Sequence, residues 1–371
     1  MKRHGAITQV ELAGATGLSP ASVSNIVREL ADAGVLHLGY GIRSGRRATR
    51  VTLARQQGLV LGVHYSQRYL RMALADAGRI VVAEHHLPLP PEHRADASLD
   101  RAALMLGDML ESVEADRSEL RAIGIALPAP VDTAAGRISV PGLLRGWDGV
   151  DVARTFEARV GIETHVDNEA NLAALAEWQD GSGKGVESLF YLSASYGIAG
   201  GLILGGRPFR GRRGIAGEIG HVSIDEAGPI CRCGNRGCLE AFAGSGALLE
   251  QLPSSHRALK LADLVHRAND GDAVCRRVVA DAGRRIGFAL AKAQNLLDVD
   301  RVVIGGELAE TNELLLSPIR HAFEAHVLGG MAAAPEVVAA ALGSRAQLVG
   351  AVALALQNIE GRVAVVQSNA S

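Results

Sequence analysis

The first fifty residues carry apolar side chains at a helical period in two short segments. Gly17 separates the segments, and Ser19 followed by Pro20 is a typical helix start, because serine caps a helix and proline suits its first position. The apolar positions are Val10, Leu12, Ala13 and Leu18, then Val23, Ile26, Val27 and Leu30. The pattern predicts two helices joined by a tight turn, the arrangement that places a second helix in the DNA major groove.

Beyond Gly34 the pattern changes to two β-prone arms around a tip of glycine, serine and arginine. The arms predict a hairpin that resembles the wing of a winged helix-turn-helix, and we place this head at residues 1–54. Polar residues of the second helix would read bases, and wing arginines would contact the DNA backbone or minor groove. The predicted DNA-binding residues are Ser22, Ser24, Asn25, Arg28, Arg43, Arg46, Arg47 and Arg50. The alternative is an ordinary helical pair with a solvated basic loop.

Strand-like and helix-like segments alternate through the body of the chain, residues 58–371. A long helical segment precedes a buried strand that begins at Arg301, and an apolar helix at about 348–360 closes the body. This alternation predicts a mixed α/β fold with two lobes and a cleft between them, where small ligands usually bind. We expect lobe one at about 58–165 plus the closing helix, and lobe two at about 166–347.

The charge of the chain also changes between the head and the body. A length of 371 residues suggests two or three units, and 48% apolar with 21% charged residues is ordinary for a globular protein. Residues 1–50 carry four more basic than acidic side chains, whereas the remainder carries six more acidic than basic ones. A basic head on an acidic body suits a small domain that meets phosphates, attached to a larger one that does not.

Two features bear on where the protein acts. The amino-terminal segment has a basic start but no apolar core after it, so we expect no signal peptide and a cytoplasmic location. The uncharged run 188–206 contains five glycines and three serines, and it therefore predicts two buried strands with a glycine-rich turn and no membrane span.

Three cysteines and a histidine fall close together in the run GEIGHVSIDEAGPICRCGNRGCLE. Thiolates and imidazole are the ligands that tetrahedral zinc prefers, and the nearby glycines let the backbone turn tightly enough to bring them together. The predicted ligands are His221, Cys231, Cys233 and Cys238, which leave no position for a catalytic water, so the zinc would be structural. The alternatives are three unrelated buried thiols and a redox disulfide, although the spacing is not Cys-x-x-Cys.

This same run, with GEIGH followed by Cys-x-Cys-Gly-x-x-Gly-Cys-x-Glu, closely resembles the signature of the ROK family of repressors, open reading frames and sugar kinases. The resemblance extends with gaps from about Leu59 to Leu356. It implies a two-lobed actin-like ATPase fold with a zinc-binding loop, and assembly as a homodimer or a dimer of dimers. A DNA-binding head is carried only by the repressor members. Related heads begin with a further helix, which we expect to be short or missing here, because only seven residues precede the helix pair.

The resemblance also implies a sugar pocket. Asn168 would bind a sugar hydroxyl, and Glu169 stands where kinases of the family keep the aspartate that acts as general base. Glu218 and Glu240 match two further sugar ligands, and His221 would bind zinc through one ring nitrogen and sugar through the other. The alternatives are a surface-helix role for Glu169 and a purely structural role for the other two glutamates. A family asparagine of the same pocket corresponds to Gly142 here.

The phosphate segments depart from the kinase pattern. The Asp-x-Gly-x-Thr turn is replaced by His64, Tyr65, Ser66, Gln67 and Arg68. A second glycine-rich turn is replaced by residues 195–199, although the pair Gly305 and Gly306 resembles the turn on the adenosine side. Small residues let backbone amides approach phosphates, so bulky side chains there argue against ATP binding and kinase activity, and we expect no catalytic residue.

The sequence therefore predicts a sugar-responsive transcriptional regulator, a repressor, whose partners are an operator DNA, a small sugar and a second copy of the chain. The alternative is an ATP-dependent sugar kinase with an appended DNA-binding head. A third interpretation is a DNA-binding protein whose body serves only as a dimerisation scaffold.

Overall fold

The structure is a computed structural model that describes residues 7–32, 36–43, 46–53, 58–256, 258–329 and 335–368. The chain forms two compact units. The first comprises residues 1–126, 150–166 and 351–371, and the second comprises 127–149 and 167–350. The range predicted for lobe one is therefore interrupted, because residues 127–149 group with the second unit.

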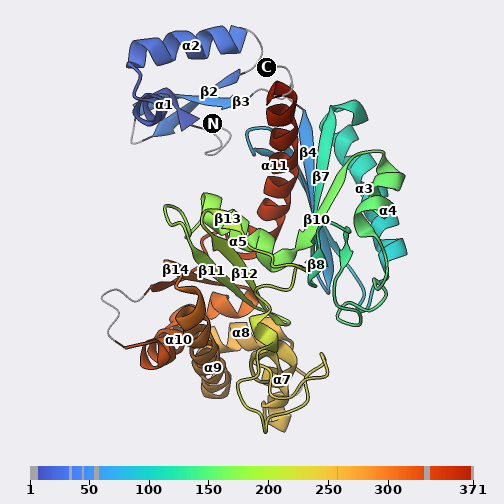
Figure 1. The fold of residues 1–371 in the computed structure, drawn as a ribbon, viewed down its shortest axis with the longest axis vertical. Coiled ribbons are helices and arrows are strands. Elements are labelled where there is room, and N and C mark those ends of the chain that lie inside the picture. Colours follow the sequence, from blue (N-terminus) through green and yellow to red (C-terminus); the bar gives the residue numbers. More distant parts are fainter. Residues whose placement is uncertain are drawn as a thin grey trace. The chain divides into compact units, whose positions relative to one another are not determined.

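The head contains the predicted helix pair followed by a hairpin (Figure 1). Its elements are β1 (Ile7–Thr8), α1 (Gln9–Thr16), α2 (Pro20–Asp32), β2 (Leu36–Arg43) and β3 (Arg46–Leu53). β2 and β3 pair antiparallel, and β1 adds to the far edge of β3. A small core is made of Val23, Val27, Leu36 and Val51.

Local hydrogen bonds explain where the two helices begin. Ser22 donates its backbone N–H to the Ser19 hydroxyl over 3.1 Å, which confirms the predicted cap of α2. Gly17 ends α1 with a φ of 70°, a conformation that glycine adopts without strain. The start of α1 carries an unpredicted capping box, in which Thr8 and Glu11 exchange side-chain and backbone hydrogen bonds. The Thr-x-x-Glu spacing in the sequence is the signal for that box.

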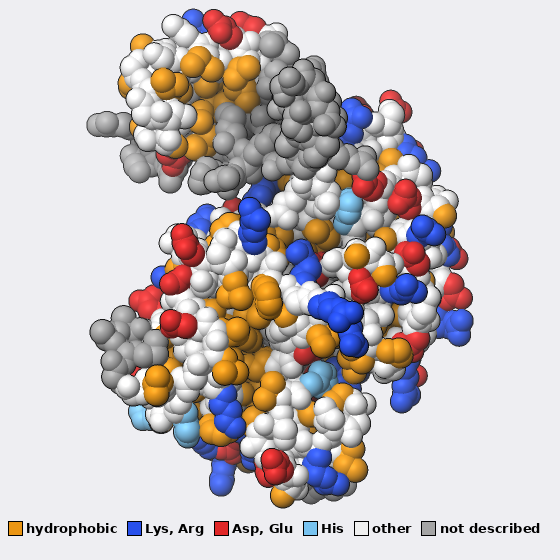
Figure 2. Space-filling model, in the orientation of Figure 1, with side chains coloured by type: hydrophobic (Ala, Val, Ile, Leu, Met, Phe, Trp, Pro, Cys, Tyr) orange, Lys and Arg blue, Asp and Glu red, His pale blue; other side chains and the backbone are white. Residues whose placement is uncertain are grey.

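Apolar side chains remain on the surface of the head, and Figure 2 shows several on the face in view. α1 buries no side chain fully. The exposed members are Val10, Leu18, Ile26 and Leu30, of which Val10 is 79% exposed.

The first unit of the body is built on a five-stranded sheet of order β10-β7-β4-β5-β6. Its strands are β4 (Leu59–Tyr65), β5 (Tyr69–Asp76), β6 (Val81–Pro88), β7 (Leu120–Leu127) and β10 (Thr164–Asn168). β4, β5 and β6 pair antiparallel, and β7 runs parallel to β4. α3 (Ala95–Ser112) and α4 (Val152–Val160) lie on one face of this sheet, and the closing helix α11 (Ala346–Ser368) lies on the other (Figure 1).

The second unit is built on a sheet of order β13-β12-β11-β14-β15. Its strands are β11 (Leu189–Ala194), β12 (Ile198–Leu204), β13 (Arg207–Pro208), β14 (Arg301–Gly305) and β15 (Glu336–Ala339), and a separate two-stranded pair joins β8 (Val131–Asp132) to β9 (Arg137–Ile138). The hairpin of β11 and β12 is the predicted pair of buried strands in the uncharged run. No helix among the described residues is long and apolar enough to cross a membrane.

Helices that lie wholly within the described residues of the second unit are α5 (Glu169–Asp180), α6 (Glu240–Ala243), α7 (Ser245–Glu250), α8 (Leu261–Asn269), α9 (Ala273–Leu297) and α10 (Glu313–His326). α9 and α10 lie side by side (Figure 1), and glycine allows their close approach. A Cβ at Gly287 would overlap the carbonyl oxygen of Ile319 on α10. The backbones of the two helices therefore meet at this point, with no room for a larger residue.

We expect Gly287→Ala to lower the free energy of unfolding by about 1–3 kcal/mol, because the added methyl forces α9 and α10 apart. Gly107 is the matched control, since it is exposed in α3 and a Cβ added there would have nothing within 4 Å. Gly107→Ala should raise stability by up to about 1 kcal/mol through helix propensity. Urea unfolding of both variants measures the difference, and equal effects would mean that the two helices are not in contact at Gly287.

Candidate functional site

The predicted metal ligands converge. One ligand atom from each of His221, Cys231, Cys233 and Cys238 lies within 4.8 Å of the others. The Cys231 sulfur is 3.6 Å from His221 Nδ1, and the Cys233 and Cys238 sulfurs are 3.7 Å apart. All four cysteines of the chain are free thiols in the structure, so no disulfide competes for these sulfurs. Three thiols and one imidazole around a common point form a donor set that fits a tetrahedral ion such as zinc.

A tight hairpin brings the three cysteines together. Cys231 donates its N–H to the Asn235 carbonyl over 2.7 Å, and Gly237 donates to the Pro229 carbonyl over 2.8 Å. Gly237 has a φ of 68°, and a Cβ there would overlap the carbonyl oxygen of Asp225. The glycine that precedes the last cysteine is therefore required by both conformation and space. An isolated bridge between Ser223 and Cys238 ties the hairpin to the segment that follows His221.

His221 faces two ways. Its Nδ1 points to the cysteine sulfurs, whereas its Nε2 lies 4.0 Å from an oxygen of Glu218. Burial lowers the pKa of His221, and the neutral ring is the form that binds metals. The histidine therefore lies between the metal cluster and an acidic cluster.

The acidic cluster contains the three glutamates that the sequence singled out. Burial and the nearby carboxylate of Glu240 raise the pKa of Glu218 to about 7, and Glu169 adds to the rise. Glu240 is only 8% exposed at the start of α6, and Glu169 is half-buried at the start of α5. Glu218 lies just before the short 3-10 turn that carries His221. Chain segments far apart in the sequence thus bring three carboxylates within electrostatic reach of one another.

Sequence reasoning missed Arg232, which stands between two of the metal-ligand cysteines. Its Nε donates to Glu240 Oε1 over 2.6 Å and its second guanidinium nitrogen donates to Oε2 over 3.2 Å. The same Oε2 also accepts the Ile198 backbone N–H over 3.0 Å. This fork of two parallel bonds is the strong form of an arginine–carboxylate pair. The one signal in the sequence was a basic residue inside Cys-x-Cys with an acid two positions after the last cysteine.

Part of the Asn168 side chain is already hydrogen-bonded to the backbone. Its Oδ1 accepts the N–H of Ala170 over 2.7 Å and caps α5, so its side-chain amide nitrogen is the group that could meet a ligand. The preceding residue, Asp167, has a fully buried carboxylate that the sequence analysis also missed. Asp167 accepts a hydrogen bond from Arg210 Nε over 2.6 Å and one from Asn171 over 3.0 Å. This network fixes the end of β10 against the segment after β13.

The two predicted phosphate turns have different structures. The turn after β4 is filled by side chains, since the buried Tyr65 hydroxyl donates to the Ser98 carbonyl over 3.1 Å and His93 contacts the Ser66 carbonyl over 2.9 Å. Between β11 and β12 the chain is tighter, with Ser195 donating its N–H to the Gly197 carbonyl over 3.0 Å. Burial raises the pKa of Glu307, which follows the Gly305–Gly306 pair and bonds the Ser195 side chain.

The remaining predicted positions lie in two places. Gly142 has a φ of 85° and donates its N–H to Asp148 over 2.9 Å, so its backbone belongs to an exposed turn. On α2, Ser22, Asn25 and Arg28 are exposed and Ser24 is half-buried. The side chains of the four predicted wing arginines, Arg43, Arg46, Arg47 and Arg50, lie outside the described part of the structure.

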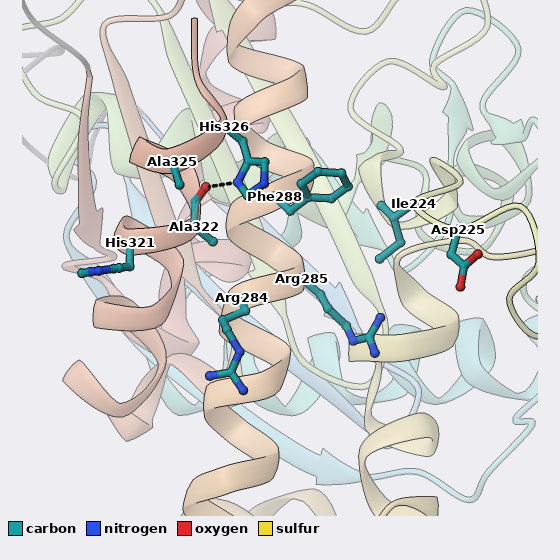
Figure 3. Close-up of a pocket in the computed structure, with 9 residues that line it drawn as sticks. All are labelled: Ile224, Asp225, Arg284, Arg285, Phe288, His321, Ala322, Ala325 and His326. Carbon is teal, nitrogen blue, oxygen red and sulfur yellow. Dashed lines mark hydrogen bonds between the residues drawn. The ribbon is translucent and has the colours of Figure 1, made fainter. Parts of the chain in front are cut away.

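A separate groove of about 570 Å³ lies between α9, α10 and the residues Ile224 and Asp225 (Figure 3). Phe288 is at its centre, and His326 meets that ring edge-on with centroids 4.9 Å apart. None of the predicted site residues lines this groove. The groove is therefore distinct from the acidic cluster.

Comparison with known families matches two parts of the chain. The ROK family model matches residues 60–358, and a winged helix-turn-helix DNA-binding model matches residues 1–36. The predicted fold class, a winged helix-turn-helix before a ROK α/β body, is thereby confirmed.

The chain is similar along nearly its whole length to named regulators. It is 31% identical to the DNA-binding transcriptional dual regulator NagC of Escherichia coli K12, over 95% of this chain and 89% of that protein. Among solved structures it is similar to a ROK family transcriptional regulator described as a homologue of the E. coli MLC protein, with 26% identity, coverage of 95% and 91%, and a TM-score of 0.73. A ROK family glucokinase from Streptomyces griseus, solved with glucose and AMPPNP, is 28% identical, with coverage of 81% and 100% and a TM-score of 0.71.

We expect Cys238→Ser to remove most bound metal, because it replaces one of four convergent ligands, of which thiolate is the preferred type. Cys275 is the matched control, since it is the one cysteine outside the cluster and is buried in α9. Elemental analysis of the two purified variants should give about one metal per chain for Cys275→Ser and much less for Cys238→Ser. Loss of metal in Cys275→Ser alone would instead place the ion at the second group of possible ligands, His256, Asp272 and Cys275.

Proposed function

The chain belongs to the ROK family, and from that premise we propose that it is a sugar-responsive, DNA-binding transcriptional regulator that acts as a repressor. The observation that carries the proposal is the pairing of a winged helix-turn-helix head with a buried acidic and hydrogen-bonding site in the same chain. A regulator of chromosomal genes would act in the cytoplasm.

The geometry of α2 supports its role as the DNA-reading helix. Val23 and Val27 are buried, and Asn25 and Arg28 lie on the opposite side of the helix, exposed to solvent. Asparagine can pair with adenine and arginine with guanine or phosphate. We propose that Ser22, Ser24, Asn25 and Arg28 contact bases and that Arg43, Arg46, Arg47 and Arg50 on the hairpin contact the DNA backbone. Two heads in a homodimer would fit two half-sites about one helical turn apart.

The acidic cluster supports a neutral polyol as the ligand. Glu169, Glu218 and Glu240 supply acceptors for hydroxyls, and Asn168 and His221 supply donors. We propose that zinc is held by His221, Cys231, Cys233 and Cys238 and is structural, because four protein ligands complete its tetrahedron. When bound, zinc supplies the crosslink that holds the hairpin. Binding polar hydroxyls in a buried site gives strong selection against wrong analogues, since their absence leaves buried polar groups unpaired.

The same contacts argue against phosphoryl transfer. Tyr65, His93 and Ser98 fill the turn after β4, where a kinase of this family brings small residues close to phosphate. Glu307, whose pKa is raised by burial, occupies the space beside Ser195 at the second turn. The alternative, a sugar kinase with a DNA-binding head, is favoured by the similarity to the Streptomyces griseus glucokinase. ADP formation that depends on sugar and is lost in Glu169→Gln would select that alternative.

A ligand can shift DNA binding only if it binds two states of the protein with different affinity. A ~100-fold change in operator affinity corresponds to about 3 kcal/mol of coupling. Selection of binding sites from genomic fragments, with and without a panel of monosaccharides, tests the whole proposal. Enrichment of an inverted repeat that one sugar abolishes would support it, and enrichment that no sugar changes would favour the scaffold interpretation.

We expect Arg28→Ala to weaken binding to the selected operator by about 1–3 kcal/mol, because a bidentate base contact is worth that amount. Arg101, exposed on α3, is a matched control for the loss of one positive charge. Fluorescence anisotropy at fixed salt should show a large loss for Arg28→Ala and little change for Arg101→Ala. Equal affinities of the two variants would exclude Arg28 from the DNA interface.

At a pH above the raised pKa of Glu218, about 7, we expect Glu218→Gln to reduce the affinity for the responsive sugar about 10- to 100-fold while leaving operator affinity unchanged, because a charged acceptor is replaced by a neutral amide of the same shape. Glu226→Gln is the control, since Glu226 is exposed in the neighbouring loop. Calorimetry with the sugar and anisotropy with the operator measure the two effects. A sugar response that survives in Glu218→Gln would remove this residue from the proposed pocket.

A further inference from the structure

The two partners of the Arg232–Glu240 ion pair are close neighbours in the sequence of the predicted metal ligands. Arg232 lies between Cys231 and Cys233, and Glu240 comes two residues after Cys238. Each partner is therefore attached by one or two peptide units to a residue whose side chain points into the cluster. The position of the guanidinium relative to the carboxylate depends on the path of the hairpin between them.

Glu240 connects this pair to the turn between β11 and β12. Its Oε2 accepts both the Arg232 guanidinium and the Ile198 N–H, and its Oε1 accepts Arg232 Nε. A Cβ at Gly197 would lie 2.5 Å from Glu240 Oε2 and 3.3 Å from the guanidinium, so the turn leaves room for the pair by having glycine there. A carboxylate offers about four acceptor sites. Three are in use, and one site on Oε1 remains for a ligand hydroxyl.

From these contacts we infer that Arg232 is a positioning residue that couples metal binding to the orientation of Glu240. An ion bound by Cys231 and Cys233 fixes the backbone on both sides of Arg232, and an ion bound by Cys238 fixes the backbone that leads into Glu240. The two hydrogen bonds from Arg232 then orient the Glu240 carboxylate so that one acceptor site on Oε1 can meet a ligand hydroxyl. The inference rests on the proposed metal and sugar sites and assigns to Arg232 the link between them.

Linkage makes the inference measurable without knowing the sugar. If metal binding stabilises the Arg232–Glu240 pair, the pair must raise metal affinity by the same factor. The positive charge of Arg232 beside a cation acts in the opposite direction, so a charge-matched control is needed. Arg236 provides one, because it belongs to the same hairpin and donates to the Gly228 carbonyl over 2.9 Å, away from Glu240.

The experiment measures the affinity of the full-length chain for Zn²⁺ alone, by competition with a chromophoric chelator. Relative to Arg236→Gln, we expect Arg232→Gln to bind Zn²⁺ about 3- to 30-fold more weakly, a range that allows for the 44% exposure of the Arg232 side chain. Arg232→Lys should recover part of the loss, since lysine keeps the charge but not the fork. In a Glu240→Gln background, Arg232→Gln should no longer weaken binding.

The absorption spectrum of bound Co²⁺ tells whether Arg232→Gln weakens metal binding with the four ligands still in place or by disrupting the ligands themselves. The bands of a three-thiolate, one-imidazole site should keep their shape in Arg232→Gln, because all four ligands remain. Equal Zn²⁺ affinities for Arg232→Gln and Arg236→Gln would overturn the inference, as would additive effects of Arg232→Gln and Glu240→Gln or a changed Co²⁺ spectrum. These results concern only the metal and the ion pair, so absence of DNA binding or of a sugar response would count against the proposed function instead.

Discussion

The hairpin between His221 and Glu240 is the constraint on which the candidate site depends. Within it three thiols and one imidazole converge within 4.8 Å, and the same short stretch carries Glu218 on one side and Glu240 on the other. Secondary structure supplies little of this order, because the hairpin is held by isolated bridges and tight turns. An ion with four protein ligands would replace the hydrophobic core that such a short loop cannot build.

The acidic cluster brings three carboxylates together with only part of their charge neutralised. Burial disfavours the charged form of Glu218, and the neighbouring carboxylates of Glu240 and Glu169 repel it, so the pKa of Glu218 is raised to about 7. Arg232 offsets part of this charge and forms a fork with Glu240. The carboxylates are thus partly neutralised by partners from the metal hairpin, and the polar site stays compatible with a folded interior.

The body has the fold of proteins that include both regulators and kinases. A Streptomyces griseus glucokinase and a homologue of the E. coli MLC regulator have similar TM-scores to this chain, 0.71 and 0.73. The overall fold therefore does not separate the two activities. In this chain Tyr65 packs against His93 and donates to the Ser98 carbonyl, and Glu307 follows the Gly305–Gly306 pair.

Features that depend on neighbours in the sequence were predictable, and features that depend on distant segments were not. The helix start at Ser19, the hairpin of β11 and β12 and the spacing of the three cysteines are local, because period, caps and glycine positions act over a few residues. The bond of Asp167 to Arg210 joins residues 43 positions apart, and that of Ile198 to Glu240 joins residues 42 apart. A charged side chain in the sequence has many possible partners, and only the tertiary structure, by burying some and exposing others, decided that Arg232 meets Glu240 and that Arg210 meets Asp167.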